Sequence, residues 1–229
     1  MNVLTKRLAR IALAAAIFLC GCASPALRPL CILHTNDVHG HLMPERVEGW
    51  KRPLGGAAVL AGCVRGIRAH NDAAGVPTLL LDAGDIFLGT PEGNLSKGLA
   101  ATDVMNAVGY DAMAVGNHEF DLGIDVAAAL VRSARFPVLG ANVRIPPAAA
   151  PPPPLRPYAV VERGGLKVGI IGVITETTPA IVMPGRTGKI VFEKPEEIVR
   201  ACMAELRAEG VDLVVLLSHC GSEEDRRIA

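Results

Sequence analysis

Aromatic residues are scarce in this sequence, making up 3% of its 229 residues. A surface that binds nucleic acid by stacking bases on aromatic rings is therefore not expected. The formal net charge is zero, so no long-range attraction draws the chain toward nucleic acid or an anionic membrane surface. Half of the residues are hydrophobic, enough for a sizeable core, and the length suits one large domain or one domain and part of another.

Closely spaced cysteine pairs of the zinc-binding kind are absent once residues 1–22 are set aside. The remaining cysteines are Cys31, Cys63, Cys202 and Cys220. They form no Cys-x-x-Cys or Cys-x-Cys group, and the sequence allows three disulfide pairings without favouring one. Cys63 and Cys202 fall on apolar faces of helical patterns, so we expect both to be packing residues.

The N-terminal segment has the residue order of a secretory leader. Lys6, Arg7 and Arg10 form a basic region, and a short apolar run follows at 11–19. This run is shorter than the roughly 20 apolar residues that a membrane-spanning helix needs. A basic region, an apolar run and then small residues are typical of a segment that directs export.

The end of this segment, residues 19–22 (LCGC), resembles a bacterial lipobox, in which the cysteine after a small residue is lipidated and becomes the new N-terminus. We therefore expect a signal peptide with a lipobox over 1–22, a linker over 23–29 and a membrane anchor at Cys22. An ordinary cleaved leader and an uncleaved N-terminal anchor are the alternatives.

Apolar runs alternate with helical patterns along the remainder of the chain. Strands are predicted at 30–35, 78–82, 112–115, 138–139 and 211–217, and helices at 55–70, 102–108, 124–133 and 194–209. Such alternation predicts an α/β layered fold. The proline-rich stretch 146–157 is interpreted as an exposed, partly polyproline II connection. Two strands over 158–174, joined at a Gly-Gly pair, indicate a hairpin and suggest a second sheet.

Polar and ionisable residues follow four of the predicted strands, at the carboxyl ends where ligands of open α/β sheets bind. These groups are residues 36–39, 82–85, 116–119 and 218–219. They are far apart in the sequence, so they converge only if their strands lie in one sheet. Each group alone is a weak indication, since a polar loop, a turn or a helix cap would look the same. Their combination and order predict a functional site.

The residue types in these groups fit a site for two metal ions. Asp37 and His39 can turn toward one ion, and the carboxylate of Asp85 can bridge two. Asn117 supplies an amide oxygen and His219 an imidazole nitrogen. Oxygen and nitrogen ligands without thiolate suit Mn, Zn, Fe or Co, although the sequence does not identify the metal. Two such ions about 3.5–4 Å apart can activate water and neutralise a phosphoryl group.

A candidate acid–base pair lies beside these ligands. His118 and Asp121 are three residues apart, so in a helical turn the carboxylate can orient the imidazole and leave His118 facing a leaving group. The other histidines, His34, His41 and His70, are interpreted as loop or core residues.

Three segments carry a resemblance to a known family. ILHTNDVHGHL, LLLDAGDIFLGTP and MNAVGYDAMAVGNHEFDLG resemble the 5'-nucleotidase family of calcineurin-like metallophosphoesterases, and VVERGGLKVGIIGVIT and VDLVVLLSH fit the same pattern. The resemblance covers nearly all of residues 30–229. It implies an αββα sandwich, a periplasmic or cell-surface location, and hydrolysis of phosphate esters of nucleotides. From the composition and charge, no nucleic acid polymer is expected as a partner.

The resemblance also implies roles for the site residues. Asp37, His39 and Asp85 would bind one divalent metal ion, and Asp85, Asn117 and His219 the other. His118 with Asp121 resembles the catalytic pair of the family.

The family pattern continues with a Gly-His-x-His or Gly-His-x-Gln segment and a domain that binds the nucleoside, and neither is present here. A helix with Ser222 as its N-cap is predicted to begin close to the last residue of the sequence, Ala229. We therefore expect a metallophosphoesterase domain over 30–229 that is incomplete at the C-terminus, as a fragment of a longer protein or a decayed copy. Its activity as it stands is expected to be weak or absent.

Two alternative functions are consistent with the sequence. The first keeps the metal ions but changes the substrate, to a cyclic nucleotide, a nucleotide sugar or a thiosulfate ester. The second is a surface lipoprotein that binds metal without catalysis.

Overall fold

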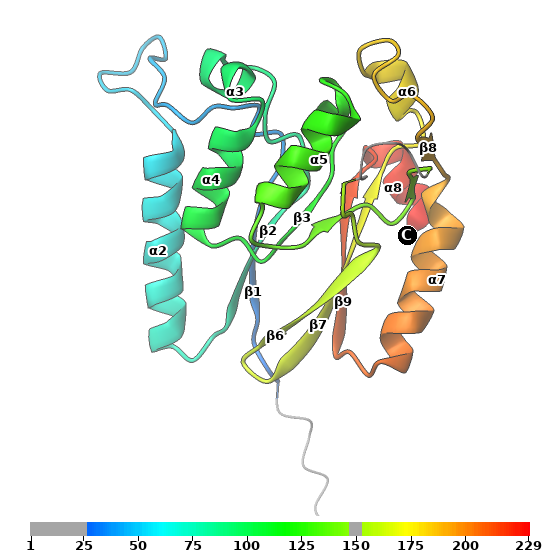
Figure 1. Ribbon diagram of the computed structural model, residues 1–229. Helices are drawn as coiled ribbons and strands as arrows, with labels where there is room; N and C mark the ends of the chain where they lie inside the picture. The colour runs from blue at the N-terminus through cyan, green and yellow to red at the C-terminus, as the bar shows by residue number, and fades with distance from the viewer. Residues whose placement is uncertain (1–26, 147–152) are drawn as a thin grey trace, which may run out of the picture.

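The computed structural model describes residues 27–146 and 153–229. Within these residues the chain forms an αββα sandwich, in which two β-sheets pack face to face between outer layers of helices (Figure 1). The α/β sandwich predicted from the sequence is therefore confirmed. The predicted signal peptide and lipobox lie outside the described residues, as do residues 147–152 of the proline-rich connection.

The first sheet has parallel strands in the order β1-β2-β3-β4. These strands are β1 (Cys31–Thr35), β2 (Thr78–Asp82), β3 (Ala112–Ala114) and β4 (Val138–Leu139). The segments between and after them form α2 (Ala57–Ala73), α3 (Pro91–Leu95), α4 (Leu99–Val108), the 3₁₀ helix η1 (His118–Phe120) and α5 (Ile124–Ser133). Because the strands are parallel, their carboxyl ends meet at one edge of the sheet, as the sequence analysis requires.

The second sheet has the order β6-β7-β9, with β6 antiparallel to β7 and β9 parallel to it. Its strands are β6 (Tyr158–Arg163), β7 (Leu166–Ile174) and β9 (Leu213–His219). The remaining elements are β5 (Val143–Arg144), β8 (Val191–Phe192), α6 (Thr178–Ile181), α7 (Pro195–Ala208) and α8 (Ser222–Ile228). β5 and β8 pair as a separate two-stranded sheet. Gly164 and Gly165 join β6 to β7 with φ angles of 54° and 74°, as the predicted hairpin turn requires.

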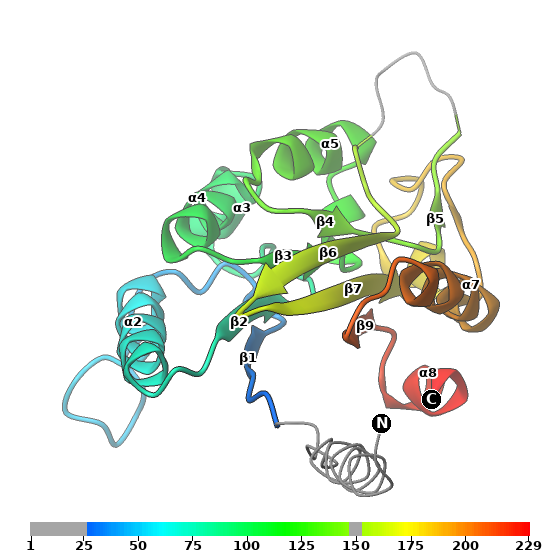
Figure 2. The ribbon, with the colours of Figure 1, turned by 90° about the horizontal axis from the view of Figure 1, so that it is seen from below.

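Alternate residues of the central strands serve different layers, because successive side chains of a strand point to opposite faces. In β2, Leu80 packs into the core beneath α2, α4 and α5, whereas Leu79 and Leu81 pack between the two sheets. In β7, Ile170 packs between the sheets, whereas Ile171 packs against α7. Viewed end-on in Figure 2, α2, α4 and α5 lie on one side of the sheets and α7 lies on the other.

The structure corrects four expectations. His219 lies on β9 in the second sheet, so the polar groups converge from two sheets and not from one. β9 begins and ends two residues later than predicted, because its register follows β7, with Ile174 opposite His219. Gly221, not Ser222, is the N-cap of α8. Cys63 is exposed and is not a packing residue, whereas Cys202 is buried as expected.

The cysteines of the described region, Cys31, Cys63, Cys202 and Cys220, are all free. Over the same residues, no helix combines the length and the apolar character that crossing a membrane would require.

Candidate metal centre

Asp37 and His39 follow β1 in a loop whose backbone turns back toward β2. Both residues have left-handed backbone angles, with φ values of 52° and 48°, which are uncommon for residues other than glycine. Their backbone N–H groups each donate a 3.0 Å hydrogen bond to the loop after β2, Asp37 to the Gly84 carbonyl and His39 to the Asp85 carbonyl. The turn places Nε2 of His39 3.7 Å from Oδ1 of Asp37.

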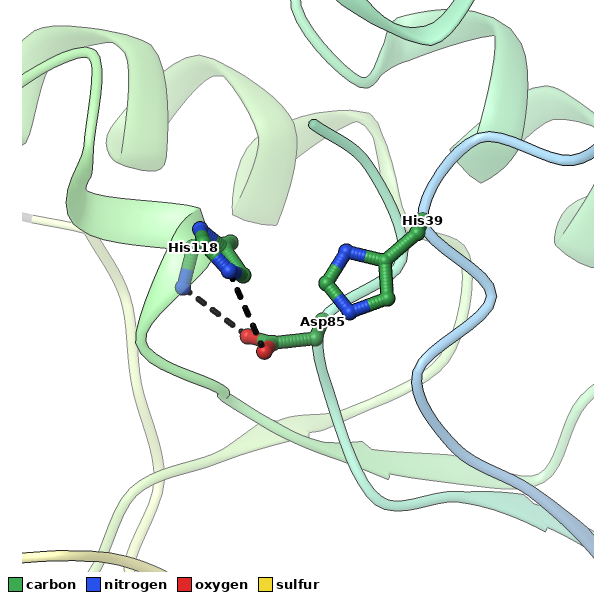
Figure 3. A group of neighbouring side chains, drawn as sticks. All are labelled: His39, Asp85 and His118. Atoms are coloured by element: carbon green, nitrogen blue, oxygen red, sulfur yellow. Dashed lines mark hydrogen bonds and ion pairs between the residues drawn. The ribbon is translucent and has the colours of Figure 1, made fainter. Parts of the chain in front are cut away.

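Asp85 lies at the centre of the site. It also has a left-handed backbone, with φ at 60°, and its side chain is 4% exposed. Oδ1 accepts a 2.8 Å hydrogen bond from the backbone N–H of His118, and Oδ2 lies 3.2 Å from Nε2 of His219. Figure 3 shows the carboxylate between the rings of His39 and His118. Burial acts to raise the pKa of Asp85, but the hydrogen bonds and charges of His219 and His118 outweigh burial and lower this pKa.

The loops after β2 and β3 approach so closely that two positions admit only glycine. A Cβ atom on Gly116 would lie 2.2 Å from Oδ1 of Asp85, and one on Gly84 would lie 2.5 Å from the backbone nitrogen of Gly116. Real Cβ atoms do not approach other heavy atoms this closely, so any side chain would push the loops apart. The glycines therefore let the carboxylate of Asp85 lie directly against the loop that carries Asn117 and His118.

Three imidazole rings reach the centre, and Nδ1 of each ring forms a hydrogen bond with an oxygen acceptor. Nδ1 of His39 lies 3.0 Å from the Leu88 carbonyl, and Nδ1 of His219 lies 2.7 Å from the Ala83 carbonyl. Because Nδ1 of each of these two rings donates to a carbonyl, Nε2 is the nitrogen left to bind a metal ion.

His118 has the same arrangement, with a carboxylate as its acceptor. Its Nδ1 is hydrogen-bonded to the carboxylate of Asp121, as the spacing of these residues predicted. The other oxygen of Asp121 accepts a 2.6 Å hydrogen bond from the backbone N–H of Met183, which fixes the carboxylate. Nε2 of His118 lies 3.9 Å from Oδ2 of Asp85 and remains directed toward the centre.

His219 and Asp85 form a charged pair in the absence of a cation. Burial acts to lower the pKa of His219, but the hydrogen bond and negative charge of Asp85 outweigh burial and raise this pKa to about 9. A divalent cation at this position would replace the imidazole proton with positive charge of its own. The pair is therefore suited to bind a metal ion with release of a proton.

The candidate ligands form two groups that share one residue. His39, Asp85 and His118 form one, and Asp37, Asp85 and His219 form the other, with the ligand atoms of each group within 4.8 Å of one another. Oδ1 of Asn117 lies 3.2 Å from Nε2 of His219 and so adjoins the second group. All seven predicted site residues thus converge. The first group includes His118, to which the family resemblance gave a catalytic role and not a ligand role.

Two buried acids at the site were not among the predicted residues. Glu119 is fully buried, and burial together with the charge of Asp85 raises its pKa to about 7. Burial also raises the pKa of Asp82 to about 7, against hydrogen bonds from the Thr35 hydroxyl and the Gly84 N–H. Both acids stand in the motifs that the sequence analysis selected, but neither position shows from the sequence that its side chain turns inward.

A groove of about 670 Å³ opens beside the candidate ligands, between β1 and β9. Apolar side chains of the two strands line it, Ile32 from β1 and Val215 and Leu217 from β9. Asn117 and His219 border it at the end nearest the candidate metal centre.

Comparisons by sequence and by structure both find relatives that are named as nucleotidases. A 5'-nucleotidase of Bos taurus is 39% identical over 215 residues, which cover 90% of this chain and 36% of that protein. A 5'-nucleotidase of Vibrio cholerae is 37% identical over 195 residues, covering 84% of this chain and 34% of that protein. No family model matches the chain.

Among solved structures, a 5'-nucleotidase precursor from Thermus thermophilus has a TM-score of 0.76 and 41% identity, and the match covers 87% of this chain and 39% of that one. The NAD nucleotidase of Haemophilus influenzae also has a TM-score of 0.76, with 31% identity, over 87% of this chain and 36% of that one.

The fold and the converging ligands define a metallophosphoesterase-type sandwich. Within that class, the chain belongs to the 5'-nucleotidase family of metallophosphoesterases. It spans little more than a third of the length of the curated relatives that it matches, for example 36% of the bovine protein.

Proposed function

We propose that the protein is a metal-dependent phosphohydrolase that releases phosphate from nucleotides. The observation that carries this proposal is the convergence of two groups of oxygen and nitrogen ligands on one carboxylate, that of Asp85. The names of the relatives, 5'-nucleotidase and NAD nucleotidase, support nucleotides as the substrate class.

Asp37, His39, Asp85, Asn117 and His219 would hold two divalent ions, with Asp85 shared between them. The donor set fits Mn, Zn, Fe or Co, since it combines carboxylate, amide and imidazole groups without thiolate. When bound, the ions would supply Lewis acidity toward a phosphoryl oxygen and lower the pKa of water. Nδ1 of His39 and of His219 is already engaged by a carbonyl, so both rings are oriented before an ion arrives.

His118 would act on the leaving group of the ester. It can carry a proton on Nε2, which faces the centre, while Asp121 accepts the hydrogen bond from Nδ1 and stabilises the protonated ring. Because the Met183 N–H holds Asp121 in turn, the carboxylate that orients the imidazole is itself fixed. A bound substrate therefore meets a preoriented proton donor.

The groove between β1 and β9 is the place where the remainder of a substrate would lie. Its volume of about 670 Å³ is within the range of small-molecule sites. It combines apolar walls from Ile32 and Val215 with the polar groups of Asn117 and His219 at one end. This arrangement favours a ligand with one charged end, such as a phosphate ester.

A second substrate class is a pyrophosphate-linked nucleotide such as a dinucleotide or a nucleotide sugar. The 31% identity to an NAD nucleotidase supports this alternative. A solved sulfate thiohydrolase is 22% identical, which shows a shared fold and gives no support for a thiosulfate ester as substrate.

We also propose that the protein is exported and attached to a membrane by a lipid on Cys22. This proposal depends on residues 1–22, which lie outside the described part of the structure. One structural relative is called a precursor, which agrees with export.

The proposed function is tested by measuring phosphate release from nucleoside monophosphates, a dinucleotide and a nucleotide sugar. The product of the complete reading frame is first treated with a chelator and then supplied with Mn²⁺, Zn²⁺ or Co²⁺. We expect hydrolysis of at least one nucleotide, lost on chelation and restored by metal. Tight metal binding without hydrolysis of any of these esters would favour the non-catalytic alternative, and chelator-resistant hydrolysis would contradict the metal-dependent mechanism.

A further inference from the structure

Glu119 is a fully buried carboxylate that accepts three backbone hydrogen bonds. Oε2 accepts from the N–H groups of Asp85, at 3.0 Å, and Gly116, at 2.6 Å. Oε1 accepts from the N–H of Ile86, at 3.0 Å. Two of these donors belong to the loop after β2, and the third belongs to the loop after β3. One side chain thus joins the loop that carries Asp85 to the loop that carries Asn117.

The bonding between these two loops is reciprocal. Glu119, from η1, accepts from the backbone of Asp85, and the carboxylate of Asp85 accepts a 2.8 Å hydrogen bond from the backbone of His118. The loop after β2 therefore donates to the carboxylate of Glu119, and the loop after β3 donates to the carboxylate of Asp85. The carboxylate of Asp85 lies beside the imidazole of His219, whereas both oxygens of Glu119 accept hydrogen bonds from backbone N–H groups.

The backbone at Asp85 needs such support because its conformation is uncommon. Its φ of 60° lies in the left-handed region, which residues other than glycine seldom occupy without surrounding contacts that hold them there. The N–H groups of Asp85 and Ile86 stand on either side of the Cα atom of Asp85, and both donate to Glu119. The direction of the Asp85 side chain is fixed by the backbone angles that these two bonds restrain.

We propose that Glu119 is a positioning residue of the metal centre, which holds the left-handed backbone at Asp85 and thereby aims the shared carboxylate at both ions. This inference rests on the proposed binding of two metal ions. Glu119 acts through the backbone and is not a ligand.

The amide of glutamine cannot replace this carboxylate. Glutamine has nearly the same shape, but only one of its two terminal atoms accepts a hydrogen bond. Whichever way the amide is turned, its NH₂ group faces at least one backbone N–H, and the two donors repel each other. Glu119→Gln should therefore shift the loop of Asp85 and weaken metal binding by roughly tenfold or more, as the loss of groups that orient ligands does elsewhere.

Asp111→Asn provides a matched control at the opposite end of the same sheet. The side chain of Asp111 is 6% exposed, and its Oδ2 accepts a 2.8 Å hydrogen bond from the backbone N–H of Leu80. Its substitution also takes an enclosed carboxylate from a backbone donor, and it removes the ion pair of Oδ1 with the Arg163 guanidinium. Asp111 precedes β3, however, whereas the candidate ligands Asp85 and Asn117 follow the strands. The control should lower folding stability and leave the affinity for metal within about twofold of wild type.

The experiment is a calorimetric titration of each protein with Mn²⁺, alongside thermal unfolding in chelator, using the product of the complete reading frame. We expect weaker Mn²⁺ binding in Glu119→Gln and near-normal binding in Asp111→Asn. Normal Mn²⁺ affinity in a folded Glu119→Gln protein would overturn the inference, as would an equal loss in the control. If Glu119→Gln does not fold, Glu119→Asp, which keeps the charge but is one methylene too short, carries the same expectation.

The titration also separates this inference from the proposed function. A wild type that binds Mn²⁺ but hydrolyses no nucleotide would overturn the proposed function and leave the role of Glu119 to be decided by affinity alone. A wild type that binds no Mn²⁺, Zn²⁺ or Co²⁺ would overturn both.

Discussion

Nε2 of His219 lies 3.2 Å from Oδ2 of Asp85, although the two residues are positioned by different sheets. Asp85 follows β2 in the first sheet, and His219 is the last residue of β9 in the second. The candidate metal centre therefore forms where the carboxyl end of β2 in the first sheet lies near the carboxyl end of β9 in the second. Its geometry depends on the packing between the sheets as much as on the loops, which explains why its ligands are so widely separated in the sequence.

Asp85 should matter more for metal content than any ligand of a single ion, because it is the residue common to both ligand groups. We expect Asp85→Asn to lower both metal stoichiometry and turnover further than Asn117→Ala does. Elemental analysis of the purified variants, with turnover measured on the same samples, checks this order. Near-normal metal content in Asp85→Asn would show that its carboxylate is not shared.

His118 should affect turnover much more than metal content. Its Nδ1 is held by Asp121, and in our account its Nε2 carries a proton toward the leaving group. We expect His118→Ala to lower kcat by about 10²–10⁴ with most of the metal retained. Asp121→Asn should have a smaller effect, since the ring remains but is less well oriented. A loss of metal as large as the loss of turnover in His118→Ala would instead make His118 primarily a ligand.

The buried Asp82 should make the metal-free protein less stable as pH rises. Burial raises its pKa from 3.8 to about 7. Between these values the folded state holds a proton that the unfolded state has released, so the free energy of unfolding falls as pH rises through this window and then levels off. From pH 5 to pH 8 the loss should be about 3 kcal/mol, because two pKa units fall within that range.

Asp82→Asn removes this titration, so the variant should gain stability relative to wild type as pH rises. Urea unfolding in chelator at about pH 5 and pH 8 measures the change, and comparing the two proteins cancels the titration of groups that the substitution leaves unaffected. Parallel pH profiles for the variant and wild type would show that Asp82 is not protonated in the folded protein.

The proposed lipid anchor is testable without reference to the fold. Radiolabelled palmitate should enter the expressed protein, and Cys22→Ser should abolish the labelling. Unlabelled wild type that is nevertheless cleaved and exported would contradict the lipid anchor while leaving export intact.

Local features of the sequence were sufficient to predict most elements. The strand at Thr78–Asp82 and the helix at Ile124–Ser133 have the predicted bounds. In each case the flanking residues do not continue the apolar pattern, so the sequence marks where the element begins and ends. The helix α3 was not predicted, since five residues are too few for a recognisable period. The bounds of β9 lie two residues later than predicted, because its pairing with β7, far away in the sequence, determines where β9 begins and ends.

The candidate ligands could be predicted, but their arrangement could not. Spacing and residue type indicate that Asp37 and Asp85 can bind metal. They do not reveal the left-handed backbone at both residues, which arises from hydrogen bonds between loops. The inward orientation of Glu119 and Asp82 likewise depends on tertiary packing, since an acid beside a strand end is equally common on a surface.

The central claim is that two divalent ions share the carboxylate of Asp85, and electron paramagnetic resonance of the Mn²⁺-loaded protein tests it most directly. Mn²⁺ would be added stepwise to the metal-free product of the complete reading frame. We expect two Mn²⁺ to bind per chain and, as the sites fill, the spectrum of isolated ions to give way to that of a spin-coupled pair. Asp85→Asn should lose the coupled spectrum. A single Mn²⁺ per chain, or two without coupling, would contradict a shared site at Asp85.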